Sequence, residues 1–182
     1  IEVETGKQTK IHEGLFGYGD LSPNGKYLYW YSLQDTAWYA HAIEKNKTVQ
    51  LTDNSKAAFY DELNDRPMAP SSYNIAGWTE DDQHILIYDR YDIWMVDPSK
   101  ALSGKNLTNG RAAQRISRYV NLDPEEEAIA MQDPLLIRFS DEKSRASGYY
   151  LYNPANGSKK VVQEGDFSYS SRPVKAKAAK HW

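Results

Sequence analysis

The chain has 182 residues, of which 40% are hydrophobic and 26% charged, a composition that is typical of a globular domain and excludes a disordered polypeptide. Its 22 basic and 25 acidic residues give a net charge of −3, which argues against a nucleic-acid partner. No apolar run approaches the roughly 20 residues that a membrane-spanning helix needs, so we expect no membrane insertion. The absence of cysteine excludes disulfides, zinc–thiolate sites and cysteine nucleophiles.

Aromatic residues and turn signals predict an all-β fold from the start of the chain. The 14 Tyr, 5 Trp and 4 Phe favour pleated strands. Residues 4–11 are typical of a polar turn and a short strand whose first part is missing, so we expect the chain to begin inside a larger protein. The Ser-Pro-Asn-Gly sequence at 22–25 predicts a turn, because Pro presets φ and Gly accepts positive φ. Residues 27–31 follow as a strand.

The first repeat continues with a strand at 36–41 and a second polar turn phrase at 44–52. An insertion then interrupts the pattern, because residues 57–65 show no strand alternation. Phe59 and Leu63 lie four positions apart, which predicts about two turns of helix ending before Pro67.

The same elements return twice along the rest of the chain. The second repeat contains a predicted turn at 79–82, strands at 85–88 and 92–97, and the polar turn phrase at 97–108. The third repeat contains a turn at Asp123-Pro124 followed by a β-rich run at 128–131, then a strand at 148–153 and the polar turn phrase at 153–162. A further strand is expected to begin at 167–170.

The length of the repeat predicts a β-propeller. If Ser22, Thr79 and Asp123 are equivalent, the spacings are 79 − 22 = 57 and 123 − 79 = 44 residues. Units of roughly 40–50 residues with several short strands are typical of propeller blades. We therefore predict an antiparallel β-propeller fragment of about three blades with one short helical insertion. The tail of one blade spans 1–12, the three blades span about 13–54, 71–110 and 115–164, and the next blade starts at 165–182.

Two acidic groups are candidate binding residues: Asp61, Glu62 and Asp65 in the insertion, and residues 125–127 in the third turn. Neither has the alternating oxygen ligands and glycine of a calcium loop. A solvated surface explains both. In the alternative interpretation the insertion faces a substrate cavity, where Asp61, Glu62 and Asp65 contact an amino group. The Asp-Arg-Tyr-Asp sequence at 89–92 predicts a hairpin corner with a charge pair, which would contribute about 0–1 kcal/mol if exposed.

No catalytic, cofactor or metal site is predicted in this chain. It has neither a G-x-S-x-G nucleophile elbow nor a Walker loop, and the glycines of 14–19 have the wrong spacing for dinucleotide binding. None of the histidines lies three or four residues from another, so we expect surface or strand histidines rather than metal ligands. They are His12, His41, His84 and His181.

Several segments resemble known propellers. Residues 22–28 resemble the Ser-Pro-Asp-Gly-Lys strand opening of TolB-type and prolyl-oligopeptidase-type propellers. The segment 75–82, followed by 87–94, is more specific. It is similar to a segment of large secreted serine peptidases of the prolyl oligopeptidase family, of the kind common in Bacteroidetes. Residues 135–140 and 148–151 also fit this family, and the resemblance extends roughly from Gly6 to Ser171.

The resemblance implies a non-catalytic propeller that gates peptide access and lines a substrate cavity. In the family, the propeller caps a C-terminal α/β-hydrolase domain of the same polypeptide, which carries the catalytic Ser, Asp and His; no residue of this chain matches them. The implied location is periplasmic or secreted. Family members that cleave dipeptides hold the substrate amine with paired propeller glutamates, a motif that Asp61-Glu62 does not clearly match. The alternatives are a TolB-like protein-binding propeller and a carbohydrate-binding propeller.

Overall fold

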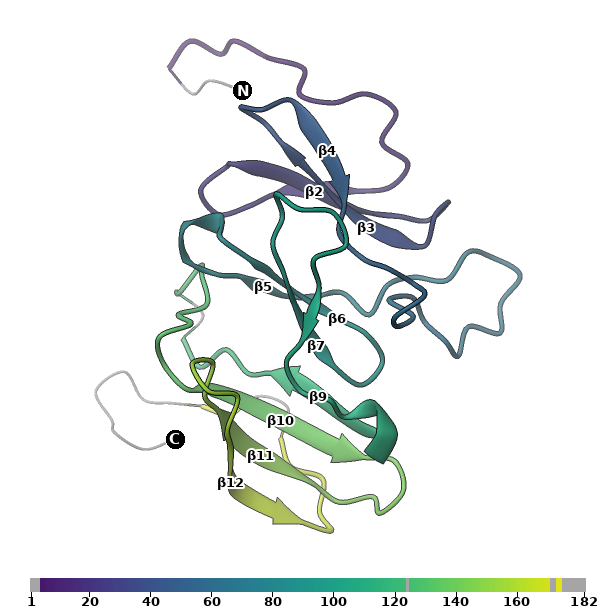
Figure 1. The fold of residues 1–182 in the computed structure, drawn as a ribbon, viewed down its shortest axis with the longest axis vertical. Helices are drawn as coiled ribbons and strands as arrows, with labels where there is room; N and C mark the ends of the chain where they lie inside the picture. The colour runs from purple at the N-terminus through teal and green to yellow at the C-terminus, as the bar shows by residue number, and fades with distance from the viewer. Residues whose placement is uncertain (1–3, 124, 171–172, 175–182) are drawn as a thin grey trace.

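The computed structural model describes residues 4–123, 125–170 and 173–174 of the chain. These residues form three four-stranded antiparallel sheets and two single-turn 3-10 helices, which confirms the predicted all-β class. Figure 1 shows the sheets following one another along the longest axis, in the order of the sequence. In each sheet consecutive strands are neighbours, so each sheet is a simple meander.

The strands have the following bounds. Sheet 1 contains β1 (Gly19–Leu21), β2 (Tyr27–Ser32), β3 (Ala37–Ala42) and β4 (Lys47–Gln50). Sheet 2 contains β5 (Ile75–Trp78), β6 (Ile85–Tyr88), β7 (Ile93–Val96) and β8 (Lys105–Asn106). Sheet 3 contains β9 (Arg115–Tyr119), β10 (Leu135–Asp141), β11 (Ser147–Tyr152) and β12 (Lys159–Gly165). The 3-10 helices η1 (Glu80–Asp82) and η2 (Arg111–Ala113) lie in the β5–β6 and β8–β9 connections.

The predicted turns take equivalent places in the sheets. The polar turn phrases at 44–52, 97–108 and 153–162 each contain the connection between the third and fourth strands of a sheet. The turn at 22–25 connects β1 to β2. Gly25 has a φ of 67° there, and its N–H donates to the carbonyl oxygen of Ser22 at 2.8 Å, so the turn needs the positive φ that glycine accepts.

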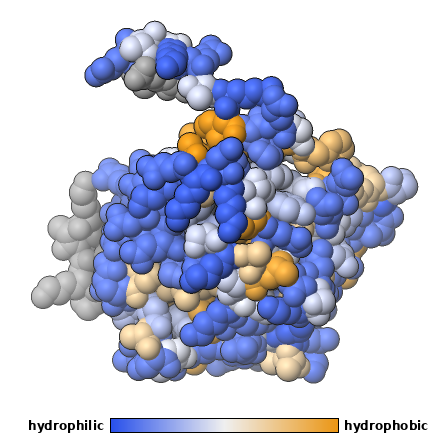
Figure 2. All heavy atoms as spheres, turned by 45° about the horizontal axis from the view of Figure 1, so that its top comes forward, coloured by the Kyte–Doolittle hydropathy of each residue, from blue (hydrophilic) through white to orange (hydrophobic). Residues whose placement is uncertain are grey.

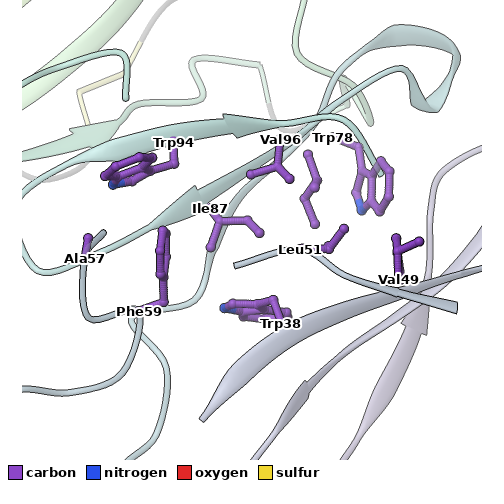
Figure 3. Packing of buried hydrophobic residues seen from close by; sticks show 11 residues of the cluster. Trp38, Val49, Leu51, Ala57, Phe59, Trp78, Ile87, Trp94 and Val96 are labelled. Carbon is purple, nitrogen blue, oxygen red and sulfur yellow. The ribbon is translucent and has the colours of Figure 1, made fainter. Parts of the chain in front are cut away.

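A first core fills the space between sheets 1 and 2 (Figure 3). Trp38 from β3 lies on one side, and Trp78 and Trp94 from sheet 2 lie on the other. Phe59 of the insertion packs edge-on against Trp94, with ring centroids 5.4 Å apart. Tryptophans in strand runs are expected to be buried between sheets, and Trp38, Trp78 and Trp94 are, at 3% to 9% exposed. Trp30 is 6% exposed but lies outside this core, against the ring of His12.

A second core fills the space between sheets 2 and 3. It contains Leu86 and Ile93 from sheet 2 and Ile137, Phe139 and Tyr150 from sheet 3. Because sheet 2 is covered on both faces, all four residues of β6 are buried. This continuous apolar strand explains why Ile-Leu-Ile-Tyr shows no alternation of apolar and polar residues.

Hydrogen bonds from two connecting segments join neighbouring sheets. Asp82 of η1 is 2% exposed, and its Oδ2 accepts a hydrogen bond from Ser22 Oγ at 2.6 Å, while its Oδ1 accepts one from the Asn24 N–H at 3.2 Å. The N–H of Ile129 donates to the carbonyl oxygen of Trp78 at 2.7 Å. This contact corrects the β-rich run expected at 128–131: Ile129 pairs with sheet 2 at an isolated bridge, and the strand of sheet 3 begins only at Leu135.

The predicted helix in the insertion is wrong. Residues 57–65 form no helix, only a hydrogen-bonded turn in which the N–H of Asn64 donates to the carbonyl oxygen of Asp61 at 3.2 Å. Phe59 is 2% exposed inside the first core whereas Leu63 is 65% exposed, so the two side chains point apart and cannot form the helical pair. Instead Tyr60 bridges to Ser72 across the insertion, because burial of Phe59 outweighs the weak helical preference of a short segment.

The strands predicted at 4–11 and 167–170 are also absent from the described residues. These segments cover the outer faces of the end sheets. The His12 ring lies 5.0 Å from the Trp30 ring on sheet 1, and the Tyr169 ring lies 6.0 Å from the Tyr149 ring on sheet 3. The other parts of the two predicted blade fragments, 1–3, 171–172 and 175–182, lie outside the described residues.

The surface view in Figure 2 is mainly hydrophilic, with hydrophobic residues in small groups. None of the helices in the described residues is long and apolar enough to span a membrane.

Candidate functional site

Loops of sheets 2 and 3 converge with the insertion into one polar and aromatic group, which we call the rim cluster. The contributing segments are the insertion with its flanks (51–74), the β6–β7 corner (89–92), the β8–β9 connection (107–114), strand β9 and the β10–β11 turn (142–146). The rim cluster consists of Asp61, Glu62, Tyr73, Asp89, Arg90, Tyr91, Arg111, Arg118 and Glu142.

The β6–β7 corner is built on two fully buried carboxylates, Asp89 and Asp92. Asp89 accepts hydrogen bonds from the N–H of Tyr91 at 2.7 Å and from Nε1 of Trp94 at 3.1 Å. Asp92 accepts one from Oγ1 of Thr108 at 2.7 Å. The corner was predicted, but a charge pair within it is wrong, since Arg90 forms its ion pair with Glu142. Nearby N–H and hydroxyl donors compensate the desolvation of both carboxylates.

Arg111 ties the insertion to this corner. Its Nη1 and Nη2 donate to the two carboxylate oxygens of Glu62 at 2.9 and 3.1 Å, and Nη2 also lies 3.2 Å from Oδ2 of Asp89. The two-pronged pairing fixes both position and orientation. Hydrogen bonding to Glu62, with a further contribution from Asp89, raises the pKa of Arg111, so this guanidinium stays charged. Its Cζ also lies 5.1 Å from the ring centroid of Tyr91.

Tyr73 holds the two acidic residues of the insertion together. Its Oη accepts a hydrogen bond from the Glu62 N–H at 2.9 Å and donates to Oδ1 of Asp61 at 3.3 Å. Burial raises the pKa of Tyr73 to about 12, so the hydroxyl remains a donor. Asp65 is exposed and makes no hydrogen bond or ion pair with the described residues. Of the three predicted candidates, the structure therefore brings Asp61 and Glu62 together and leaves Asp65 apart.

Glu142 connects the β10–β11 hairpin of sheet 3 to the corner of sheet 2. Its Oε1 accepts a hydrogen bond from Nη2 of Arg90 at 2.8 Å, and its Oε2 accepts one from Oη of Tyr91 at 2.9 Å. The hydrogen bond from Arg90 lowers the pKa of Glu142. Arg90 therefore pairs across two sheets rather than within its own corner.

Arg118 of β9 completes the rim cluster beneath the corner. Its Nη2 donates to the carbonyl oxygens of Asp89 at 3.2 Å and Arg90 at 3.0 Å. Its Cζ lies 4.6 Å from the ring centroid of Tyr88. Burial lowers the pKa of Arg118 because its neighbours are carbonyl dipoles and aromatic faces rather than a directly bonded carboxylate.

The rim cluster carries a small excess of negative charge at the insertion. Its four carboxylates and three guanidinium groups sum to 3 − 4 = −1. Glu62 and Asp89 share Arg111, whereas Asp61 has no ion-pair partner among the described residues. Asp61 is partly exposed, so an added cation can reach its carboxylate. The arrangement suits recognition of a positively charged group.

The remaining predicted candidates lie outside the rim cluster. Residues 125–127 are exposed, as expected for a solvated surface. His12 and His41 lie 29 positions apart in the chain, yet their ring centroids are 5.2 Å apart. Burial, followed by the charge of His12, lowers the pKa of His41. His84 lies apart from this pair, and His181 is outside the described residues. No group of three or more His, Asp or Glu side chains in the described residues is placed to hold a metal ion.

Sequence reasoning missed the residues that organise the rim cluster: Tyr73, Arg111, Arg118 and Glu142. Arg111 lies 49 positions from Glu62, and Glu142 lies 52 positions from Arg90. Separations of this length depend on how the sheets stack, so no local pattern in the chain indicates these pairs.

Comparison with models of protein families, with curated proteins and with solved structures finds no significant match to this chain.

Proposed function

We propose that this chain is a non-catalytic β-propeller segment of a prolyl-oligopeptidase-like serine peptidase, in which it gates the entry of peptides and lines the substrate cavity. Two observations support the proposal. Three successive four-stranded meanders stack through their faces, as propeller blades do. Residues 75–82 and 87–94 carry the family resemblance. The catalytic Ser, Asp and His would belong to an α/β-hydrolase domain of the same polypeptide.

The rim cluster is the part of this segment that we assign to the peptide substrate. The observation that carries the assignment is the Asp61 carboxylate, which is partly exposed and lacks a cationic partner among the described residues. A peptide N-terminus offers an ammonium group with several N–H donors and a positive charge, which complements this carboxylate. Glu62, held beside Asp61 through Tyr73, adds a second acceptor.

The surrounding contacts give this pair a fixed position. Arg111 holds Glu62, and the buried corner carboxylate of Asp89 holds Arg111 in turn. Because these groups are ordered before substrate arrives, little conformational entropy is lost when the amine binds. Asp65, on the same insertion, lies outside this arrangement and serves as an internal control.

The test uses the complete gene product and two chromogenic dipeptide substrates, one with a free amine and one N-acetylated. We expect hydrolysis of both, with a preference for the free amine. Asp61→Asn should lower kcat/KM for the free-amine substrate by about tenfold or more, because a charge-assisted hydrogen bond is lost, and should leave the acetylated substrate unchanged. Asp65→Asn should change neither.

Two results contradict the proposal at different levels. If the complete gene product hydrolyses neither substrate, the peptidase assignment is wrong. If it hydrolyses both but Asp61→Asn slows both equally, the chain belongs to a peptidase while the rim cluster does not bind the amine.

A further inference from the structure

Sheet 3 turns one face away from sheet 2, and an arginine lies on that face. Side chains alternate along a strand, so Ile137 and Phe139 of β10 point into the second core, whereas Leu136, Arg138 and Ser140 point outward. Leu136 belongs to a small apolar cluster on this outer face. On the outer face, Arg138 is therefore the next residue after the buried Leu136. Its strand, β10, pairs with a neighbouring strand on each side.

A cavity of about 350 Å³ opens beside Arg138, between the outer face of sheet 3 and the segment 166–168. This volume suits a small ligand or one terminal group of a larger one. Its wall contains Arg138, Ser140, Arg145, Ser147, Asp166 and Phe167. The cavity lies at the end of sheet 3 where the β10–β11 hairpin turns; it shares Glu142 with the rim cluster but not Asp61 or Glu62.

Arg138 has no partner for its charge. Its Nε is buried without a hydrogen-bond acceptor, and none of its nitrogens makes a hydrogen bond or ion pair with a described residue. Three nearby arginines are engaged in ion pairs: Arg90 with Glu142, Arg111 with Glu62, and Arg115 with Asp141. A half-buried guanidinium without an acceptor is unusual, because buried polar groups are normally hydrogen-bonded.

The carboxylates in the cavity wall do not neutralise Arg138. Oδ2 of Asp141 lies 3.5 Å from Nη2 of Arg115, and Oε1 of Glu142 lies 2.8 Å from Nη2 of Arg90. Asp166 is exposed and makes no ion pair with the described residues. The cavity is therefore positive at Arg138, and the nearby acidic groups are either turned toward other cations or lie in solvent.

The neighbouring strand adds to the positive charge. In the register of sheet 3, Arg138 lies directly opposite Arg118 of β9. Like charges at such cross-strand positions destabilise a sheet. Arg118 reaches the carbonyl oxygens of Asp89 and Arg90, so it finds compensation beyond the sheet, while Arg138 does not.

We propose that this cavity is a binding site for a carboxylate, which the guanidinium of Arg138 holds through two of its N–H groups. A planar guanidinium matches a planar carboxylate through two parallel N–H···O hydrogen bonds. Ser140, whose hydroxyl has no partner among the described residues, supplies a further donor, and Arg145 adds positive charge at the same wall. The inference stands on Arg138 and its cavity and does not depend on peptidase activity.

The test follows the Nε–Hε resonance of Arg138 by NMR while the protein is titrated with acetate, with the dipeptide Ala-Ala, or with Ala-Ala amide. We expect a saturable shift with acetate and with Ala-Ala, and none with the amide. Arg138→Gln should weaken acetate binding, measured by calorimetry, by about tenfold or more, since charge-assisted hydrogen bonds are lost. Arg138→Lys keeps the charge but should also bind more weakly. Arg66→Gln, an exposed arginine of the insertion, should bind acetate like the wild type.

Further probes separate the sources of the carboxylate. N-acetylaspartate amide presents only a side-chain carboxylate, whereas Ala-Ala presents the carboxylate of a chain terminus. The probe that binds more tightly shows which kind of carboxylate the cavity prefers. Tighter binding of inorganic phosphate than of acetate would overturn the carboxylate assignment. Unchanged acetate affinity in Arg138→Gln, in a variant whose thermal unfolding matches that of Arg66→Gln, would overturn the site itself.

Discussion

Asp82 shows how a single buried charge positions two sheets. It belongs to the connection between β5 and β6 of sheet 2, yet its carboxylate accepts hydrogen bonds from the β1–β2 turn of sheet 1. Asp81 and Asp82 both have positive φ, at 57° and 54°, a conformation that Asp and Asn tolerate better than most residues. The Asp-Asp sequence thus satisfies the backbone at both positions. The side chain of Asp82 makes the contact between sheets, whereas Asp81 contributes its backbone carbonyl oxygen, which accepts from Lys26 Nζ at 2.7 Å.

Asp82→Asn should destabilise the protein by about 1–3 kcal/mol, because one charged acceptor is lost and buried donors of sheet 1 are left unpaired. Asp81→Asn is the matched control, since it changes an exposed neighbour in the same conformation and should have little effect. Urea unfolding of both variants measures the difference. Equal stabilities would show that Asp82 does not hold the sheets together.

Trp38 tests the first core. The side chain is 6% exposed and packs against the rings of Tyr29 and Tyr31. Trp38→Ala should cost on the order of 3–5 kcal/mol, since it opens a cavity between sheets 1 and 2. Trp38→Phe should cost clearly less. A loss below about 1 kcal/mol for the alanine variant would mean that the two sheets do not pack through this residue.

Turns and strands could be predicted from the sequence wherever the determining residues are local. The Pro-Asn-Gly turn and the aromatic run after it depend on φ preferences and on β propensity, and both are present as expected. The insertion could not be predicted, because Phe59 is buried against Trp94, 35 positions further along the chain. The same limit applies to the rim cluster: Asp61 and Glu62 are visible as an acidic pair, but Arg111 reaches Glu62 only through stacked sheets.

The β10–β11 hairpin should respond to acid through Glu142. Hydrogen bonding from Arg90 lowers the pKa of Glu142 from its ordinary value of 4.5. A carboxyl with a depressed folded-state pKa contributes its full stability above the unfolded value and loses it as the pH falls through the folded value. The stability difference between wild type and Glu142→Gln, measured by urea unfolding, should therefore be constant above about pH 5 and shrink below about pH 4. A difference that does not change with pH would contradict the ion pair.

The fourth strand of sheet 3 is a long edge strand. β12 (Lys159–Gly165) is exposed along most of its length, and Val161 and Val162 are 52% and 41% exposed. An exposed edge strand with apolar side chains favours pairing with another chain, although Lys159 and Lys160 partly oppose it.

We expect the 182-residue chain to self-associate through this edge. Light scattering over a concentration series should show a rising mean mass, and Val161→Lys should reduce it, since an added edge charge disfavours strand pairing. Val174→Lys changes an exposed valine outside the strand and is the control. A strictly monomeric wild type at every concentration would contradict this expectation.

The propeller assignment is tested by an experimental structure of the complete gene product. We predict a closed ring in which sheets 1, 2 and 3 are consecutive blades, further four-stranded sheets complete the ring between sheets 3 and 1, and an α/β-hydrolase domain lies over it. The cavity beside Arg138 should remain open at the hairpin end of sheet 3. A structure in which the three sheets form an open stack, or pack against a different kind of domain, would contradict both the propeller and the function proposed from it.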